Sequence, residues 1–250
     1  MTRENVIKLI KHQPVRILNE LKFGTFVFGD LHNEWLRRMI TSGEDATLLA
    51  HRGSYKTTCL SVAIALLMIL RPHKNIIFLR KTDDDVKEII EQVKKILETK
   101  LLRMLVHGLY SGEGKEVDLK ITRANANELN TNLNAGTRGM VQLLGIGIKG
   151  SLTGKHADLV ITDDICTRVD RRSASERNLV KEIYAELQNI KNRDGVYSQF
   201  LDDDSIRYCD AFIVDGSGLC IILQYSGYRR LASGRGVFDS WIYHHHRRAV

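Results

Sequence analysis

The sequence contains little proline and no paired cysteines. Pro14 and Pro72 are its only prolines, so no proline-rich linker divides the 250 residues. The four cysteines are Cys59, Cys166, Cys209 and Cys220. They lie far apart and form no C-x-x-C motif, which argues against a disulfide framework and a cysteine-based zinc site. We therefore expect reduced thiols in a cytosolic protein.

Long apolar runs are also absent. The longest apolar stretch, within residues 59–70, is too short to cross a bilayer. The N-terminal segment M-T-R-E-N-V-I-K-L-I-K lacks the apolar run of a signal peptide. We expect a protein that is not secreted and has no membrane partner.

The charge is moderately basic. Thirty-seven Lys and Arg against 30 Asp and Glu give a net charge of +7, and the sequence pI is near 9.2. This balance is compatible with a polyanionic partner and equally with an ordinary basic protein. The length predicts one large domain, or one domain with a small appendage.

The stretch Ala50–Thr58 carries the strongest chemical signal. It reads A-H-R-G-S-Y-K-T-T and lies between an apolar run at 46–49 and an apolar segment at 59–70. A strand, a small-residue loop, Lys-Thr and a buried helix are typical of a phosphate-binding loop. Backbone N–H groups and the helix dipole favour an anion there. Lys56 is then expected at the β- and γ-phosphates of ATP, and the Thr57 hydroxyl at Mg²⁺.

This loop departs from the usual G-x-x-x-x-G-K-[ST] pattern. Ala50 and Tyr55 stand at the two glycine positions, and only Gly53 has free access to positive φ. The alternative is a lysine at the start of a core helix. The candidate nucleotide-binding residues are Arg52, Gly53, Ser54, Tyr55, Lys56, Thr57 and Thr58.

A second candidate site follows a buried strand. Residues 158–164 read D-L-V-I-T-D-D, and the strand ends in Asp163 and Asp164. In a nucleotide-hydrolysing sheet, the metal and the attacking water lie at the C-terminal edge of the strands. We expect Asp163 to hold the Mg²⁺ and Asp164 to orient or deprotonate the water. The alternative is an Asp-Asp pair that caps the next turn.

The remaining patterns predict an α/β fold with a mostly parallel central sheet flanked by helices, as in a P-loop NTPase. Helices are expected at 1–22 with a break at Pro14, at 29–41, at 83–98 and, behind a capping box of Ser173 and Glu176, at 173–190. Further strands are expected at 75–80, 117–123 and 140–147, with an exposed connection at 124–137. In the helix at 29–41, Leu31, Trp35 and Met39 lie four apart and are expected on one apolar side. His32 and Trp35 either flank an adenine ring or cover the core edge.

Taken together, these passages resemble the ATPase domain of tailed-phage terminase large subunits. The resemblance rests on H-N-E-W-L at 32–36, H-R-G-S-Y-K-T-T at 51–58, I-I-F-L-R-K-T at 76–82 and G-S-L-T-G-K-H-A-D-L-V-I-T-D-D at 150–164. It covers about residues 25–193. It implies the Walker A role for Lys56 and Thr57, a γ-phosphate contact for Arg52, the Walker B metal role for Asp163 and the catalytic carboxylate for Asp164. Many family members have Glu at that last position, and Asp is one methylene shorter.

The resemblance ends near residue 194. The family's Thr- or Ser-rich coupling motif, with Trp-His close behind, is not found in D-G-V-Y-S-Q-F-L-D-D-D, and the tail has no room for the family's nuclease domain. We therefore divide the chain into an ATPase domain at 1–195 and a divergent or poorly ordered tail at 196–250. A frameshift near codon 194 and a natural divergent terminus are the two explanations.

The resemblance implies an ATPase motor that moves double-stranded DNA into a procapsid without sequence specificity. It implies a portal protein and a small terminase subunit as partners, assembly as a homo-oligomer on the portal, and the host cytoplasm of a phage or prophage as location. Two alternatives stay open. One is another P-loop nucleic-acid ATPase such as a helicase, and the other is a truncated, non-catalytic remnant that binds nucleotide or DNA.

Overall fold

The computed structural model describes most of the chain. The described residues are 1–42, 46–50, 53–112, 114–134, 140–165, 170, 172–202 and 241–244. The prediction for Arg52 and most of the predicted tail at 196–250 therefore lie outside the described residues.

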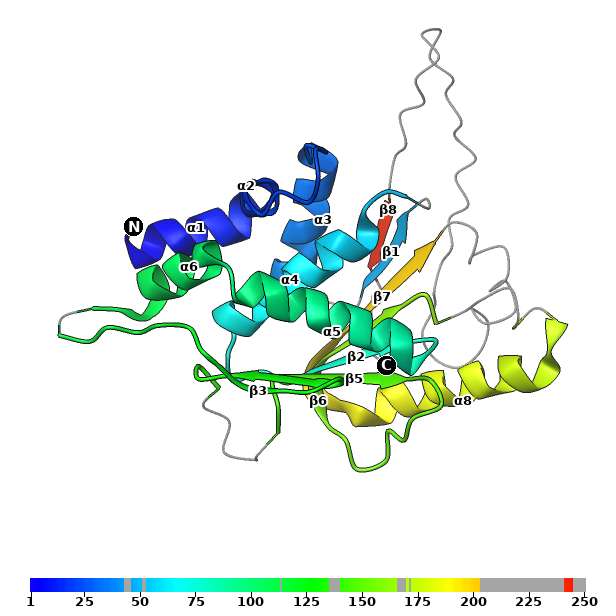
Figure 1. Cartoon of the computed structure of the whole chain (residues 1–250). Helices are drawn as coiled ribbons and strands as arrows, with labels where there is room; N and C mark the ends of the chain where they lie inside the picture. The colour runs from blue at the N-terminus through cyan, green and yellow to red at the C-terminus, as the bar shows by residue number, and fades with distance from the viewer. Residues whose placement is uncertain are drawn as a thin grey trace, which may run out of the picture.

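Helices and strands alternate through the middle of the chain (Figure 1). The helices are α1 (Arg3–His12), α2 (Pro14–Glu20), α3 (Asp30–Thr41), α4 (Lys56–Leu70), α5 (Asp83–Leu97), α6 (Lys100–Tyr110) and α8 (Ala174–Ile190). The strands are β1 (Ala46–Ala50), β2 (Ile76–Arg80), β3 (Ile121–Ala124), β4 (Glu128–Thr131), β5 (Leu143–Gly147), β6 (Ala157–Asp163), β7 (Lys191–Asp202) and β8 (Trp241–His244).

The strands form one mixed sheet in the order β3-β4-β5-β2-β6-β7-β1-β8. The five strands from β5 to β1 pair in parallel, whereas β3, β4 and β8 add antiparallel pairs at the two edges. The predicted α/β class with a parallel sheet centre is confirmed. Parallel strands bring their C-terminal ends to one edge, which is where ligands bind in open α/β sheets.

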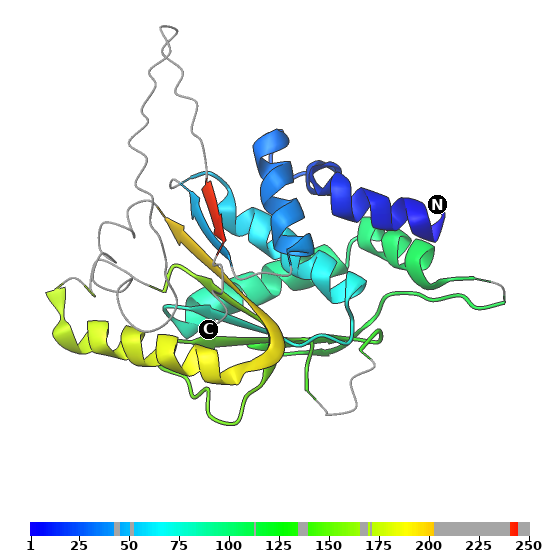
Figure 2. The same cartoon turned by 180° about the vertical axis from the view of Figure 1, so that it is seen from behind.

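Helices cover both faces of this sheet. Side chains alternate along β2, so that Ile76 and Phe78 join the core shared with α4 and α5, while Ile77 and Leu79 join the core shared with α8. Figure 2 shows α8 on the face opposite α4 and α5. A strand buried on both faces reads as a continuous apolar run, and this explains why I-I-F-L was recognisable in the sequence.

Helix α4 lies at the centre of the larger core. Twelve of its 15 residues are buried, and it packs against α3 and α5. Each buried Leu or Ile side chain contributes roughly 1.5–3 kcal/mol relative to exposure. This packing holds the N-terminal end of α4, and with it Lys56, in a fixed place.

Several predicted elements differ from the structure. The expected connection at 124–137 contains β4, and α6 was not predicted. The predicted apolar face of α3 was displaced, because Leu31 is 37% exposed and the buried face is formed by His32, Trp35, Leu36 and Ile40. Strand β4 reads E-L-N-T and lies next to the edge strand β3. Its polar residues give no apolar alternation, so the sequence pattern did not predict a strand there.

The two ends of the chain were predicted with unequal detail. Pro14 occupies the first turn of α2, as the predicted helix break requires. Strand β7 runs across the proposed boundary at residue 195, and it pairs with both β6 and β1. Strand β8, from the predicted tail, pairs with β1. The part of the tail that the structure describes is therefore joined to the sheet.

Among the described residues, no helix has both the length and the apolar character needed to cross a membrane.

Candidate functional site

Two residues of the predicted phosphate loop before α4 have left-handed backbone conformations. Gly53 has φ 81° and Tyr55 has φ 60°, both in the left-handed region. Tyr55 is the N-cap of α4, and Lys56 is the first helical residue. The Tyr55 backbone therefore adopts, with a side chain present, a conformation that glycine adopts at no steric cost.

Lys56 contacts both carboxylates that end β6. Its Nζ lies 2.7 Å from Asp164 Oδ1 and 3.3 Å from Asp163 Oδ1. The Lys56 side chain is 3% exposed, that of Asp163 is fully buried and that of Asp164 is 25% exposed. The two segments predicted to converge do so, and the Asp-Asp pair faces the phosphate loop.

Arg80, the last residue of β2, contacts the same carboxylates. Its Nε lies 3.2 Å from Asp163 Oδ2, and its Nη2 lies 3.8 Å from Asp164 Oδ2. The register explains this position, because Leu79 pairs with Thr162 and brings the ends of β2 and β6 side by side. Sequence reasoning missed Arg80, although a charged residue at the C-terminal end of a buried strand was a usable signal.

Opposing effects act on the buried Asp163 carboxyl. Burial raises its pKa, the neighbouring Lys56 ammonium lowers it, and the Asp164 carboxylate and the Arg80 guanidinium raise and lower it respectively. The resulting pKa lies above its ordinary value. Two cations facing two acidic groups balance the charge of the cluster, which limits the cost of burying it.

Two hydroxyls near this cluster suit a metal and a phosphate. The Thr57 hydroxyl lies 3.5 Å from Asp163 Oδ2. The buried Ser54 Oγ has no hydrogen-bond partner among the described residues, and no well-directed hydrogen bond reaches Asp163 Oδ1. Hard oxygen donors of this kind are the ligands that Mg²⁺ prefers, and the N-terminus of the 15-residue helix α4 favours an anion. These residues fit a Mg²⁺-bound triphosphate.

An aromatic group adjoins the phosphate loop. The rings of Phe26 and Tyr55 are stacked with centroids 4.5 Å apart, and these side chains are 43% and 40% exposed. His32 Nε2 donates to the Ser54 carbonyl, and burial lowers the pKa of His32 against the effect of that bond. Trp35 is 1% exposed and belongs to the core, so the interpretation that it flanks an adenine was wrong. Sequence reasoning also missed Phe26.

The other predicted residues take simpler positions. Gly53 is exposed in the loop, and Thr58 is half-buried in the first turn of α4. Ser173 Oγ accepts a hydrogen bond from the Glu176 backbone N–H, which confirms half of the predicted capping box. Within the described ranges, no group of three or more His, Cys, Asp or Glu side chains forms a separate metal site.

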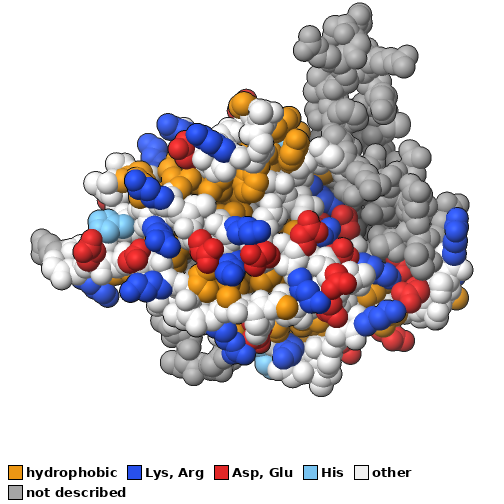
Figure 3. Space-filling model, viewed as in Figure 1, with side chains coloured by type: hydrophobic (Ala, Val, Ile, Leu, Met, Phe, Trp, Pro, Cys, Tyr) orange, Lys and Arg blue, Asp and Glu red, His pale blue; other side chains and the backbone are white. Residues whose placement is uncertain are grey.

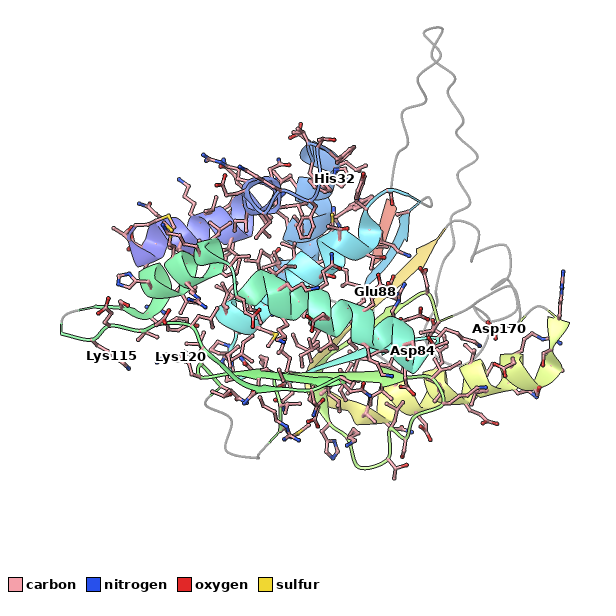
Figure 4. The ribbon with its side chains drawn as sticks, viewed as in Figure 1. His32, Asp84, Glu88, Lys115, Lys120 and Asp170 are labelled. Atoms are coloured by element: carbon pink, nitrogen blue, oxygen red, sulfur yellow. The ribbon has the colours of Figure 1, made fainter. Side chains whose placement is uncertain are left out.

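A separate open cavity of about 520 Å³ lies away from this edge of the sheet. It is lined by residues of the hairpin-like segment 110–120 and by Asn132 and Leu133. Figure 4 places its Lys115 and Lys120 at the opposite end of the molecule from Asp170, which precedes α8. The chemistry-bearing side chains gather at the phosphate loop and not in this cavity, so we assign the candidate site there.

Comparison with known proteins adds no family assignment. No protein-family model matches the sequence, and no curated protein matches it either.

Proposed function

We propose that this chain is a P-loop ATPase and, more narrowly, the motor domain of a DNA-packaging terminase large subunit. The observation that supports the ATPase most directly is the position of Lys56, with its ammonium between Asp163 and Asp164 at the N-terminus of a buried helix. A buried structural lysine would also need acidic partners. The ATPase is therefore favoured by the ion pair together with the N-terminus of α4 and the buried Ser54 hydroxyl beside it, which has no hydrogen-bond partner in the described part of the chain.

The residues of the site have distinct roles in this proposal. Lys56 turns from the carboxylates towards the β- and γ-phosphates, where the Ser54 hydroxyl and the first backbone N–H groups of α4 also donate. Thr57 and Asp163 hold Mg²⁺, which when bound neutralises charge on the phosphate oxygens. Asp164 accepts a proton from the attacking water. The exposed ring faces of Phe26 and Tyr55 suit a nucleobase.

The narrower assignment depends on the resemblance of the four passages quoted above. This assignment implies double-stranded DNA, a portal protein and a small terminase subunit as partners. It also implies a homo-oligomer on the portal and a location in the host cytoplasm. In Figure 3, Lys side chains are mixed with Asp and Glu side chains over α5. Mixed charges of this kind give no continuous positive potential for a phosphate backbone. We therefore expect DNA to contact another face, with an affinity that falls as the salt concentration rises.

A second candidate is a non-catalytic remnant that binds nucleotide or DNA. The segment after α8 favours it, because β7 reads K-N-R-D-G-V-Y-S-Q-F-L-D and lacks the Thr- or Ser-rich coupling motif. In this candidate, Lys56 and the carboxylates still bind a nucleotide, but hydrolysis does not follow.

The test is steady-state ATP hydrolysis with and without double-stranded DNA, for the wild type, Lys56→Ala and Asp164→Asn. The proposal predicts that each variant loses at least about 100-fold in kcat and that DNA stimulates the wild type. Wild-type turnover no faster than that of Lys56→Ala would leave the remnant as the better account. Strand separation of a duplex would favour a helicase, whereas binding to a portal would favour a terminase.

A further inference from the structure

Two cations reach the Asp163–Asp164 pair from different carboxylate oxygens. Lys56 Nζ faces the Oδ1 atoms of both residues. Arg80 faces the Oδ2 atoms of both, through Nε to Asp163 and through Nη2 to Asp164. The Arg80 side chain is 15% exposed, and its contacts are ion pairs, because Arg80 Nε makes no well-directed hydrogen bond among the described residues. Arg80 therefore contacts the pair from a second direction, which the proposed phosphate role of Lys56 does not use.

These cations are attached to the fold in different ways. Lys56 carries a compact charge on a flexible stem, whereas Arg80 presents a rigid, planar fork of donors. The residue after Arg80 is also fixed, because Lys81 Nζ lies 2.5 Å from Asp170 Oδ1 and 3.1 Å from Glu176 Oε2. Asp170 is 1% exposed, and Figure 4 shows it beside the start of α8. The C-terminal end of β2 is therefore tied to the helix on the far face of the sheet.

We infer that Arg80 is a positioning residue of the nucleotide site. It keeps Asp163 and Asp164 in their places when Lys56 turns from them to the phosphates. This inference rests on the proposed function, since it assigns a role within the same site. Asp164 adds to the need for such a residue, because its backbone has φ 49°, a left-handed conformation that strains every residue except Gly, although Asp tolerates it better than most. A local conformation of this kind persists only where the surrounding contacts maintain it.

The loss of Arg80 has a specific physical consequence. With Lys56 engaged elsewhere, the loss of Arg80 removes a cation that faces both acidic side chains, and the repulsion between these side chains increases. The carboxylate of Asp164 then leaves the orientation needed to accept a proton, whereas the phosphate contacts of Lys56 and α4 are unchanged. At saturating Mg²⁺, the expected effect is therefore on kcat and not on KM.

The kinetic test compares Arg80→Gln and Arg80→Lys with the wild type. Arg123→Gln is the matched control. Arg123 lies on β3, at the far edge of the same sheet, and is ion-paired with Glu128 of β4. We expect kcat to fall about 100-fold in Arg80→Gln and about tenfold in Arg80→Lys, which keeps the charge but loses the fork. KM for ATP should stay within about twofold of the wild-type value in both. Wild-type kcat in either folded variant, or a change confined to KM, would overturn the inference.

A second measurement separates this inference from the proposed function. Hydrogen–deuterium exchange is measured without nucleotide in the Lys56→Ala background, where the ammonium that also faces the two carboxylates is absent. Exchange at residues 163–165 should be faster when either Arg80 substitution is added to Lys56→Ala, and exchange at 121–131 should be unchanged, relative to Lys56→Ala alone. Arg123→Gln should show no effect at 163–165. If the wild type hydrolyses no ATP, the proposed function fails, and exchange alone decides whether Arg80 positions the carboxylates. Unchanged exchange at 163–165 overturns the inference in either case.

Discussion

The ammonium of Lys56 lies 2.7 Å from Asp164 Oδ1, although 108 positions separate these residues in the chain. One is fixed by the N-terminus of the most buried helix, and the other follows the last residue of a central parallel strand. The fold itself brings the basic and the acidic group together, and this relationship underlies the predictions below.

The stack of Tyr55 on Phe26 explains a bulky residue at a left-handed position. Tyr55→Ala should destabilise the chain by about 1 kcal/mol, because the ring contact is lost while the strained backbone remains. Tyr55→Gly should be more stable than Tyr55→Ala by about 1 kcal/mol, since glycine adopts φ 60° freely. Chemical denaturation monitored by circular dichroism measures both. Tyr55→Phe is the control that keeps the ring, and equal stability of the Gly and Ala variants would refute the explanation.

The Thr57 hydroxyl should lower the Mg²⁺ concentration that ATP hydrolysis requires. Thr57→Val keeps the shape of the side chain and removes the hydroxyl that lies 3.5 Å from Asp163 Oδ2. We expect the Mg²⁺ concentration for half-maximal hydrolysis to rise about tenfold or more. Titration of Mg²⁺ at saturating ATP measures this. The matched control is Thr41→Val, which removes a hydroxyl bonded to the Arg37 carbonyl at the end of α3, and an identical Mg²⁺ dependence in both variants would contradict the assigned role.

His32 should make stability depend on mild acid. Burial lowers the pKa of His32 from its ordinary value of 6.5, so the folded chain binds fewer protons than the unfolded chain below about pH 6.5. The contribution of His32 to stability is therefore present above pH 6.5 and is lost as the pH falls. His32→Gln preserves a donor for the Ser54 carbonyl and does not titrate. The free energy of unfolding, measured from pH 7.5 to 5, should fall more steeply in the wild type than in this variant, and parallel curves would exclude the effect.

The sequence allowed the centre of the fold and the ion cluster to be predicted for a common reason. Continuous apolar runs marked β2, β6 and α4 as buried on all sides, and the polar residues that follow or precede them had to lie at the sheet edge. The convergence of Lys56 with Asp163 and Asp164 followed from that placement.

Other features could not be read from periodicity. Arg80 meets the carboxylates only because β2 and β6 are neighbours in a particular register, and the contact of Phe26 with Tyr55 joins a loop to a helix start. In α3, apolar spacing of four residues selected a displaced face, because His32 is buried by its bond to the Ser54 carbonyl. These relationships are tertiary, and no local pattern carries them.

Calorimetric titration with Mg²⁺ and a slowly hydrolysed ATP analogue tests the central claim most directly, because it measures whether the loop and the carboxylates hold a triphosphate. Lys149→Ala is the matched control, since it removes an equal charge from an exposed side chain paired with Glu176. The account predicts binding by the wild type and by Lys149→Ala, and an affinity at least about tenfold lower in Lys56→Ala. Equal affinity of Lys56→Ala and the wild type, or no binding by the wild type, would contradict it.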